Sequence, residues 1–144
     1  MVMAVIGILS SLAVPHLERA KEMAQVAKAI ADVRVLESEV FDFFNFHEFY
    51  PNSLEEIGRS GYLDPWGNPY EFLNLVGHKK GKVETEGGDV KGRKNKFLKP
   101  INDDFDLFSM GLDGEYKEDL NKKESRDDVI RAMNGAYVGL ASEF

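Results

Sequence analysis

The chain opens with an apolar run that changes into a regular alternation of apolar and charged positions. Residues 1–15 contain no charged side chain, and the first charge is Glu18. From Pro15 onward, apolar residues recur at steps of three and four, which is the spacing of one face of an α-helix. These residues are Leu17, Ala20, Ala24, Ala27, Ile30 or Ala31, Val35 and Val40. The pattern predicts one long N-terminal helix, kinked or loosened by Pro15 around residues 11–15.

The second half of this helix is predicted to pack on a folded head. Segment 33–46 is much more apolar than segment 18–32, with Val33, Leu36, Val40, Phe43 and Phe44 at helical spacing. Such a stripe is typical of a helix that covers a core. We expect the helix to end near residues 46–50, because the residue before Pro51 disfavours helical geometry.

The remainder of the chain predicts short elements separated by turns. A short helix over residues 52–58 is expected, with Ser53 and Glu56 as a capping box and Gly58 as its stop. A turn-rich connection at 61–69 leads to a strand at 70–76. The polar, lysine-rich segment 77–99 is expected to be a solvated hairpin tip or flexible loop, or alternatively an electrostatic contact patch for an acidic neighbour.

The pattern of the C-terminal third predicts a second strand, a charged loop, a short helix and a closing strand. Residues 105–110 have strand character, and 111–114 form a turn. A charged loop follows at 115–124. Ser125 is expected to open a short helix that contains Val129, Ile130 and Met133 and stops at residues 134–135. A closing strand at 136–142 completes an α+β fold with a long helix on a small antiparallel sheet.

Composition excludes several classes of function. The net charge of −7 argues against general nucleic-acid binding, which needs a basic surface. The chain has no cysteine and therefore neither disulfides nor thiol chemistry. Its three histidines, His16, His47 and His78, are far apart in sequence, which disfavours a histidine metal site or a catalytic triad. No residue set suggests catalysis, and we expect a protein that is not an enzyme.

The apolar run is too short to cross a bilayer unaided. It offers about fourteen apolar or small residues, whereas a transmembrane helix needs about twenty. It also lacks the basic start and small-residue cleavage site of a secretory signal peptide. We expect that the natural chain has further apolar residues before Met1, which would lengthen this run to a membrane span.

Four patches in the chain resemble one family. The run Ala4–Pro15 resembles the N-terminal segment of type IV pilins and type II secretion pseudopilins. Three further stretches resemble the major pseudopilin of type II secretion in particular: Phe49-Tyr-Pro-Asn-Ser-Leu-Glu-Glu, Asp64-Pro-Trp-Gly-Asn-Pro-Tyr70 and Asp106-Leu-Phe-Ser-Met-Gly-Leu-Asp-Gly114. The resemblance covers most of the chain except segment 77–99.

The resemblance implies a pilin fold and a structural function. Such proteins are membrane-inserted precursors that a prepilin peptidase cleaves and methylates. The mature subunit forms a helical filament, a periplasmic pseudopilus that assembles from the inner membrane and drives protein export by type II secretion. Implied partners are copies of the same chain, other pseudopilins, an inner-membrane assembly platform and membrane lipid before assembly, and no nucleic acid. The implied place is the inner membrane and periplasm of the cell envelope.

The resemblance also divides the chain into three parts. Residues 1–17 would be the apolar membrane and filament-core segment, 18–50 the amphipathic half of the helix, and 51–144 the globular head with a variable 77–99 loop. The implied filament or membrane residues are Val5, Ile6, Gly7, Ile8, Leu9, Leu12, Val14 and Pro15. Gly7 and the small residues nearby would permit close approach of neighbouring helices.

Major pseudopilins bind calcium in the loop after the turn that corresponds to residues 109–114, and the resemblance implies a Ca²⁺ site here. Carried over by position, its ligands would be the Met110 carbonyl, Asp113, Asp127 and Asp128, with Ser109 nearby. Calcium takes six to eight oxygen ligands from flexible loops. The aspartates also have ordinary explanations, as acids in the first turn of a capped helix and as a turn residue before glycine.

Three other functions stay open at the level of sequence. A type IV pilin would act in adhesion, motility or DNA uptake. A plain membrane anchor would not assemble. A membrane-anchored, calcium-dependent envelope binding domain or enzyme would show its activity in the head alone.

Overall fold

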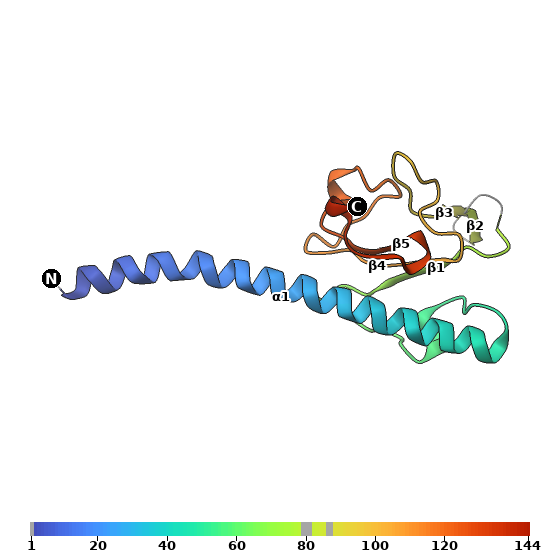
Figure 1. The fold of residues 1–144 in the computed structure, drawn as a ribbon, viewed down its shortest axis with the longest axis horizontal. Helices are drawn as coiled ribbons and strands as arrows, with labels where there is room; N and C mark the ends of the chain where they lie inside the picture. The colour runs from blue at the N-terminus through green and yellow to red at the C-terminus, as the bar shows by residue number, and fades with distance from the viewer. Residues whose placement is uncertain (1, 79–81, 86–87) are drawn as a thin grey trace.

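A long helix and a small head make up the computed structural model, which describes residues 2–78, 82–85 and 88–144, with the side chains of 2–13 and 84–89 left out. Helix α1 runs from Val2 to His47, and its N-terminal half projects away from the head (Figure 1). Within the described residues, no helix has both the length and the apolar character needed to cross a membrane. The predicted long helix and its end near residue 47 are confirmed. It passes through Pro15 without a break.

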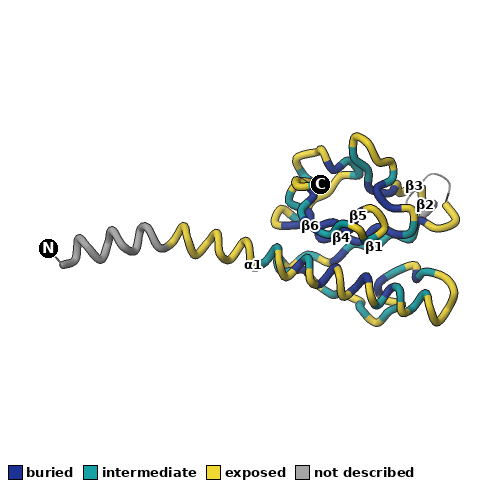
Figure 2. Tube along the Cα trace, in the orientation of Figure 1, coloured by how far each residue is buried: buried dark blue, intermediate teal, exposed yellow. Residues whose placement is uncertain are grey.

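Helix α1 has an exposed part and a packed part. Every residue from 14 to 24 is exposed (Figure 2). Buried positions then follow at helical spacing, namely Ala29, Val33, Leu36 and Val40, all at 0% exposure. These four side chains form the helix side of the main core. Val33, Leu36 and Val40 confirm part of the stripe predicted in segment 33–46, whereas Phe43 and Phe44 are half-buried and lie outside this cluster.

The head is built on a four-stranded antiparallel sheet in the order β1-β4-β5-β6. Its strands are β1 (Glu71–Asn74), β4 (Phe105–Ser109), β5 (Val129–Ala132) and β6 (Tyr137–Leu140). Strand β4 is buried at every position, because α1 packs on one face and a second apolar cluster around Phe108 and Ile130 covers the other. The α+β pilin fold is therefore confirmed, together with the predicted strands near 70–76, 105–110 and 136–142.

Short elements connect these strands. The 3₁₀ turns are η1 (Leu54–Ile57), η3 (Lys123–Ser125), η4 (Met133–Gly135) and η5 (Ala141–Glu143). Strands β2 (Lys82–Thr85) and β3 (Gly88–Lys91) pair as a hairpin. A hairpin within segment 77–99 is thus confirmed, but Gly92 and Arg93 of this segment are buried and not solvated. The contact-patch alternative stays a prediction, as does the division of the chain at residues 17 and 50.

Two local predictions were wrong. Ser53 makes no side-chain capping bond at η1; Glu56 instead accepts the backbone N–H of Asn52 at 2.9 Å, one residue earlier than a capping box requires. Gly58 does end the turn with φ +76°. The helix expected from Ser125 is only the turn η3, and residues 129–132 form strand β5. Val129 and Ile130 pair with β4 and β6, where β-branched side chains fit a buried sheet.

Candidate metal centre

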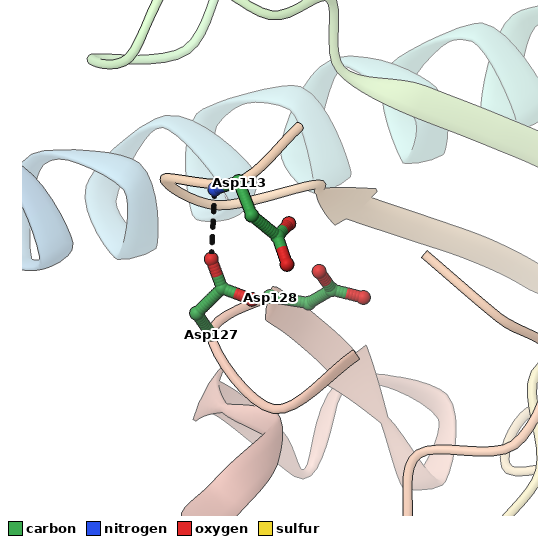
Figure 3. Close-up of side chains that lie close together, drawn as sticks. All are labelled: Asp113, Asp127 and Asp128. Carbon is green, nitrogen blue, oxygen red and sulfur yellow. Dashed lines mark hydrogen bonds between the residues drawn. The ribbon is translucent and has the colours of Figure 1, made fainter. Parts of the chain in front are cut away.

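Three aspartates from two connections meet at one end of the sheet. Asp113 lies in the turn after β4, and Asp127 and Asp128 lie immediately before β5 (Figure 3). The pairing of Ser109 with Val129 brings these two connections together. Each aspartate offers one carboxylate oxygen, and these oxygens lie within 4.8 Å of one another. The structure thus brings together the three acidic residues that the resemblance implies as calcium ligands.

The backbone around the cluster fixes the aspartates locally. Asp127 Oδ2 accepts the backbone N–H of Asp113 at 3.0 Å (Figure 3), and Asp113 Oδ1 accepts the backbone N–H of Glu115 at 2.9 Å. Gly111 has φ +66°, and a Cβ there would lie 2.7 Å from Asp127 Oδ2. A glycine is required at this position because the left-handed conformation and the close approach of Asp127 both exclude a side chain.

The electrostatics of the cluster centre on Asp128, whose side chain is fully buried. Arg93 Nη2 donates to Asp128 Oδ2 at 2.6 Å. Asp128 Oδ1 is buried and finds no hydrogen-bond partner in the part of the chain that the structure describes. Burial raises the pKa of Asp128 to about 7, with smaller contributions from the charges of Asp127 and Asp113, while Arg93 opposes the rise.

The remaining two expected ligands have different surroundings. Ser109 Oγ donates to Asp64 Oδ2 at 2.5 Å and accepts the backbone N–H of Gly111 at 3.0 Å. Its hydroxyl therefore already has partners that hold the turn. The half-buried side chain of Met110 packs against the second apolar cluster. The roles of Ser109 and the Met110 carbonyl as ligands stay predictions.

Three residues that support the centre were missed from the sequence. Asn68 Nδ2 donates to the Gly111 carbonyl at 2.8 Å, and Asp64 accepts from Ser109. Both belong to the Asp64–Tyr70 patch, so two stretches that carry the family resemblance hold each other in place. The presence of both stretches in one chain was the sequence feature that could have indicated Asp64 and Asn68 as supporting residues. Arg93 had no such signal, because it is one of many cations in segment 77–99.

The donor set suits a hard, oxygen-seeking cation. Two unit charges 4.8 Å apart repel by roughly 3 kcal/mol at an effective dielectric constant of about 20, so three clustered carboxylates favour a counter-ion. Calcium accepts carboxylate and carbonyl oxygens in flexible geometry. The unpartnered, buried Asp128 Oδ1 is the kind of atom that such an ion would satisfy. The residues present therefore fit a Ca²⁺ ion.

The helix end of the molecule holds the other group of expected functional residues. Val14 and Pro15 are exposed on the projecting part of α1. The remaining members of that group are Val5, Ile6, Gly7, Ile8, Leu9 and Leu12, whose side chains lie outside the described residues. The structure therefore places their backbone in α1 and says no more about them.

A projecting N-terminal helix, a four-stranded antiparallel sheet and an aspartate loop at the sheet edge define a pilin-like protein. The type II secretion system core protein G of Aeromonas hydrophila is 30% identical over an alignment of 135 residues that covers 79% of this chain and 78% of that protein. The chain belongs to this family, the major pseudopilins of type II secretion.

Other relatives carry the same name. The core protein G of Escherichia coli K12 is 32% identical over an alignment of 111 residues that covers 61% of this chain and 75% of that protein. The core protein G of Dickeya chrysanthemi is 29% identical over an alignment of 109 residues that covers 61% of this chain and 71% of that protein. No protein-family model and no solved structure matches the chain. The names favour the secretion function over the type IV pilin and envelope-enzyme alternatives.

Proposed function

We propose that this chain is the structural subunit of a periplasmic pseudopilus that assembles from the inner membrane and drives protein export by type II secretion. Copies of the chain form a helical filament, with other pseudopilins and an inner-membrane assembly platform as further partners. The subunit lies in membrane lipid before assembly and acts mechanically, without catalysis. The observation that carries this proposal is the part of α1 that projects from the head.

The projecting part of α1 carries apolar side chains that nothing in the described chain covers. Val14 is 54% exposed, Leu17 69% and Met23 74%. The uncharged run of residues 1–15 continues this surface in sequence. Burial of apolar surface contributes about 25 cal/mol per Å², and head-to-tail contacts between helices extend into a filament because they do not close. Helix-to-helix packing between copies is therefore the proposed means of assembly.

An acidic substitution on this part of α1 is expected to prevent assembly. Leu17→Glu places a charge at a position that is buried between subunits in the proposed filament. The expected cost is on the order of 2–4 kcal/mol per subunit contact. The expected result is loss of filaments by electron microscopy and loss of exoprotein secretion, in cells that carry the complete secretion system.

The matched control is the same substitution on the head. Phe97 is 85% exposed on a loop, and Phe97→Glu is expected to leave filaments and secretion intact. Thermal unfolding of the purified chains should be alike for both variants and the unsubstituted protein, since neither side chain belongs to the core. Normal filaments from Leu17→Glu would contradict the proposal.

We further propose that Asp113, Asp127 and Asp128 hold Ca²⁺, with the Met110 carbonyl as an additional ligand and Ser109 nearby. In support, the three carboxylates converge and Asp128 Oδ1 is buried without a partner among the described residues. A bound ion would hold the turn at 111–114 against the start of β5 and so fix the charged loop between them.

Calcium is expected to raise the melting temperature of the full chain in detergent. An ion at about 100 times its dissociation constant stabilises by about 2.7 kcal/mol, or roughly 5–10 °C for a chain of this size. Asp127→Asn should lose most of this rise. Asp103→Asn, an exposed acid outside the cluster, should retain it. Equal melting temperatures with calcium chloride and with chelator would remove the site.

A further inference from the structure

Arg93 is a cation from segment 77–99 that lies inside the head. Its residue is only 2% exposed, although the hairpin that precedes it is a surface feature. The backbone holds it firmly: its N–H donates to Asp106 Oδ2 at 2.6 Å, and its carbonyl accepts the N–H of Ile101 at 2.8 Å. The position of the guanidinium is thus set by the fold and does not depend on a flexible stem reaching from the surface.

The guanidinium is directed at a single carboxylate. Nη2 donates to Asp128 Oδ2, while Nε and Nη1 are buried and have no hydrogen-bond acceptor in the described part of the chain. Aromatic rings cover it instead, with Phe108 at 4.1 Å and Tyr116 at 5.3 Å from the guanidinium carbon to the ring centroids. A desolvated cation over aromatic faces interacts strongly with its one remaining partner.

Among the described ion pairs, that of Arg93 with Asp128 is the one that reaches the aspartate cluster. It occupies Oδ2 of Asp128, while Oδ1 has no partner among the described residues, and the Asp128 carboxylate belongs to the cluster with Asp113 and Asp127. Asp128 therefore has a cation at Oδ2 and a second oxygen, Oδ1, that is available to a metal ion.

We propose that Arg93 is a resident counter-cation of the metal centre, which compensates Asp128 when no metal is bound. This inference rests on the proposed calcium site. Removal of Arg93 leaves a buried carboxylate uncompensated in the metal-free protein, whereas a divalent ion at Oδ1 still compensates it in the loaded protein. The stability of the loop between Asp113 and Asp127 therefore depends less on calcium than it would if Arg93 were absent.

The test compares Arg93→Met with Arg131→Met in the full chain in detergent. Methionine keeps much of the volume and the contact with the aromatic rings. Arg131 is the matched control, since it is also a buried arginine but pairs with Glu37 and Asp104, outside the cluster. Melting temperatures are measured with calcium chloride, with magnesium chloride and with chelator.

The expected result is a lower melting temperature for Arg93→Met in chelator and a calcium-induced rise that is roughly double that of the unsubstituted protein. Arg131→Met should lower the melting temperature equally in both conditions, leaving the rise unchanged. If Arg93→Met does not fold in chelator, the double variant with Asp128→Asn should fold, because the uncompensated charge is gone. Failure of the double variant to recover would overturn the inference.

The outcomes separate this inference from the calcium proposal. If calcium raises the melting temperature of Arg93→Met no more than that of the unsubstituted protein, the role of Arg93 is overturned and the calcium site is still supported. A calcium-induced rise in Arg93→Met alone removes calcium binding from the unsubstituted chain and with it the role of Arg93 as the counter-cation of that site. No rise in either protein overturns both.

Discussion

Arg131→Met is expected to lower the free energy of unfolding by about 3–5 kcal/mol, since one member of a buried ion pair is lost. Arg131 is fully buried on β5, and its Nε donates to Glu37 of α1 at 2.6 Å. Both terminal nitrogens donate to Asp104, at 2.8 and 2.7 Å. Phe105 contributes a carbonyl acceptor at 2.9 Å and a ring at 3.9 Å. This arginine joins the helix to the sheet and to the connection that enters β4.

Urea unfolding, followed by the fluorescence of Trp66, measures this effect, because the single tryptophan packs against the core. Arg34→Met is the matched control. Arg34 also donates to Glu37, at 2.9 Å, but its side chain is 46% exposed, so its loss is expected to cost about 1 kcal/mol or less. Arg34 also donates to the Gly135 carbonyl at 2.7 Å. Equal losses for both variants would contradict the larger contribution that burial is expected to give Arg131.

Gly111→Ala is the second substitution with a large expected effect. The left-handed backbone of Gly111 costs an alanine about 1 kcal/mol. The added methyl group would also clash with the backbone and carboxylate of Asp127, which adds about 1–3 kcal/mol for a local overpacking. We expect a total loss of about 2–4 kcal/mol in urea unfolding, together with loss of the calcium-induced rise in melting temperature.

Gly77→Ala separates the two contributions. Gly77 has φ +84° and is exposed, and a Cβ there would meet nothing within 4 Å. Its alanine variant should therefore lose about 1 kcal/mol, from the backbone alone, and keep the response to calcium. If Gly111→Ala behaves like Gly77→Ala, Asp127 moves aside at little cost and the metal loop is not fixed by this close approach.

Helix α1 combines a part that stabilises the head with a part whose apolar side chains remain exposed. Ala29, Val33, Leu36 and Val40 bury one stripe of the helix against the sheet, whereas residues 14–24 remain exposed. Packing in the head fixes the C-terminal half independently of assembly. Exposed apolar side chains of residues 14–24, such as Leu17 and Met23, are then available for contacts with a neighbouring helix in the proposed filament.

Local sequence patterns predicted helix α1 and three of the strands, because interactions between neighbouring residues favour these elements. The three- and four-residue spacing predicted α1, and Pro51 predicted its end near residue 47. Strands β1, β4 and β6 follow from apolar, β-prone runs between turn residues. Asp113, Asp127 and Asp128 could be singled out through the resemblance to pseudopilins, and the structure brings their carboxylates together.

Other features depended on contacts between distant residues. Residues 125–133 have a capping serine and apolar positions at helical spacing, yet Val129–Ala132 is a strand, because β4 and β6 supply pairing partners on both sides. Glu56 bonds to Asn52, so the predicted capping box around Ser53 does not form. In both places a local preference of about 1 kcal/mol was outweighed by other hydrogen bonds and packing contacts.

The sequence by itself determined the uncharged opening run, the long helix, the order of most elements and the identity of the acidic residues at the candidate centre. The run, the helix and the order of elements depend on spacing and side-chain type, which are properties of a few neighbouring residues, whereas the acidic residues were singled out through the resemblance to pseudopilins. Only the tertiary structure decided that Arg93 leaves a lysine-rich surface segment to pair with Asp128 at 2.6 Å, 35 residues further along the chain. Burial made that difference, since a buried carboxylate needs a partner that the fold itself must bring to it.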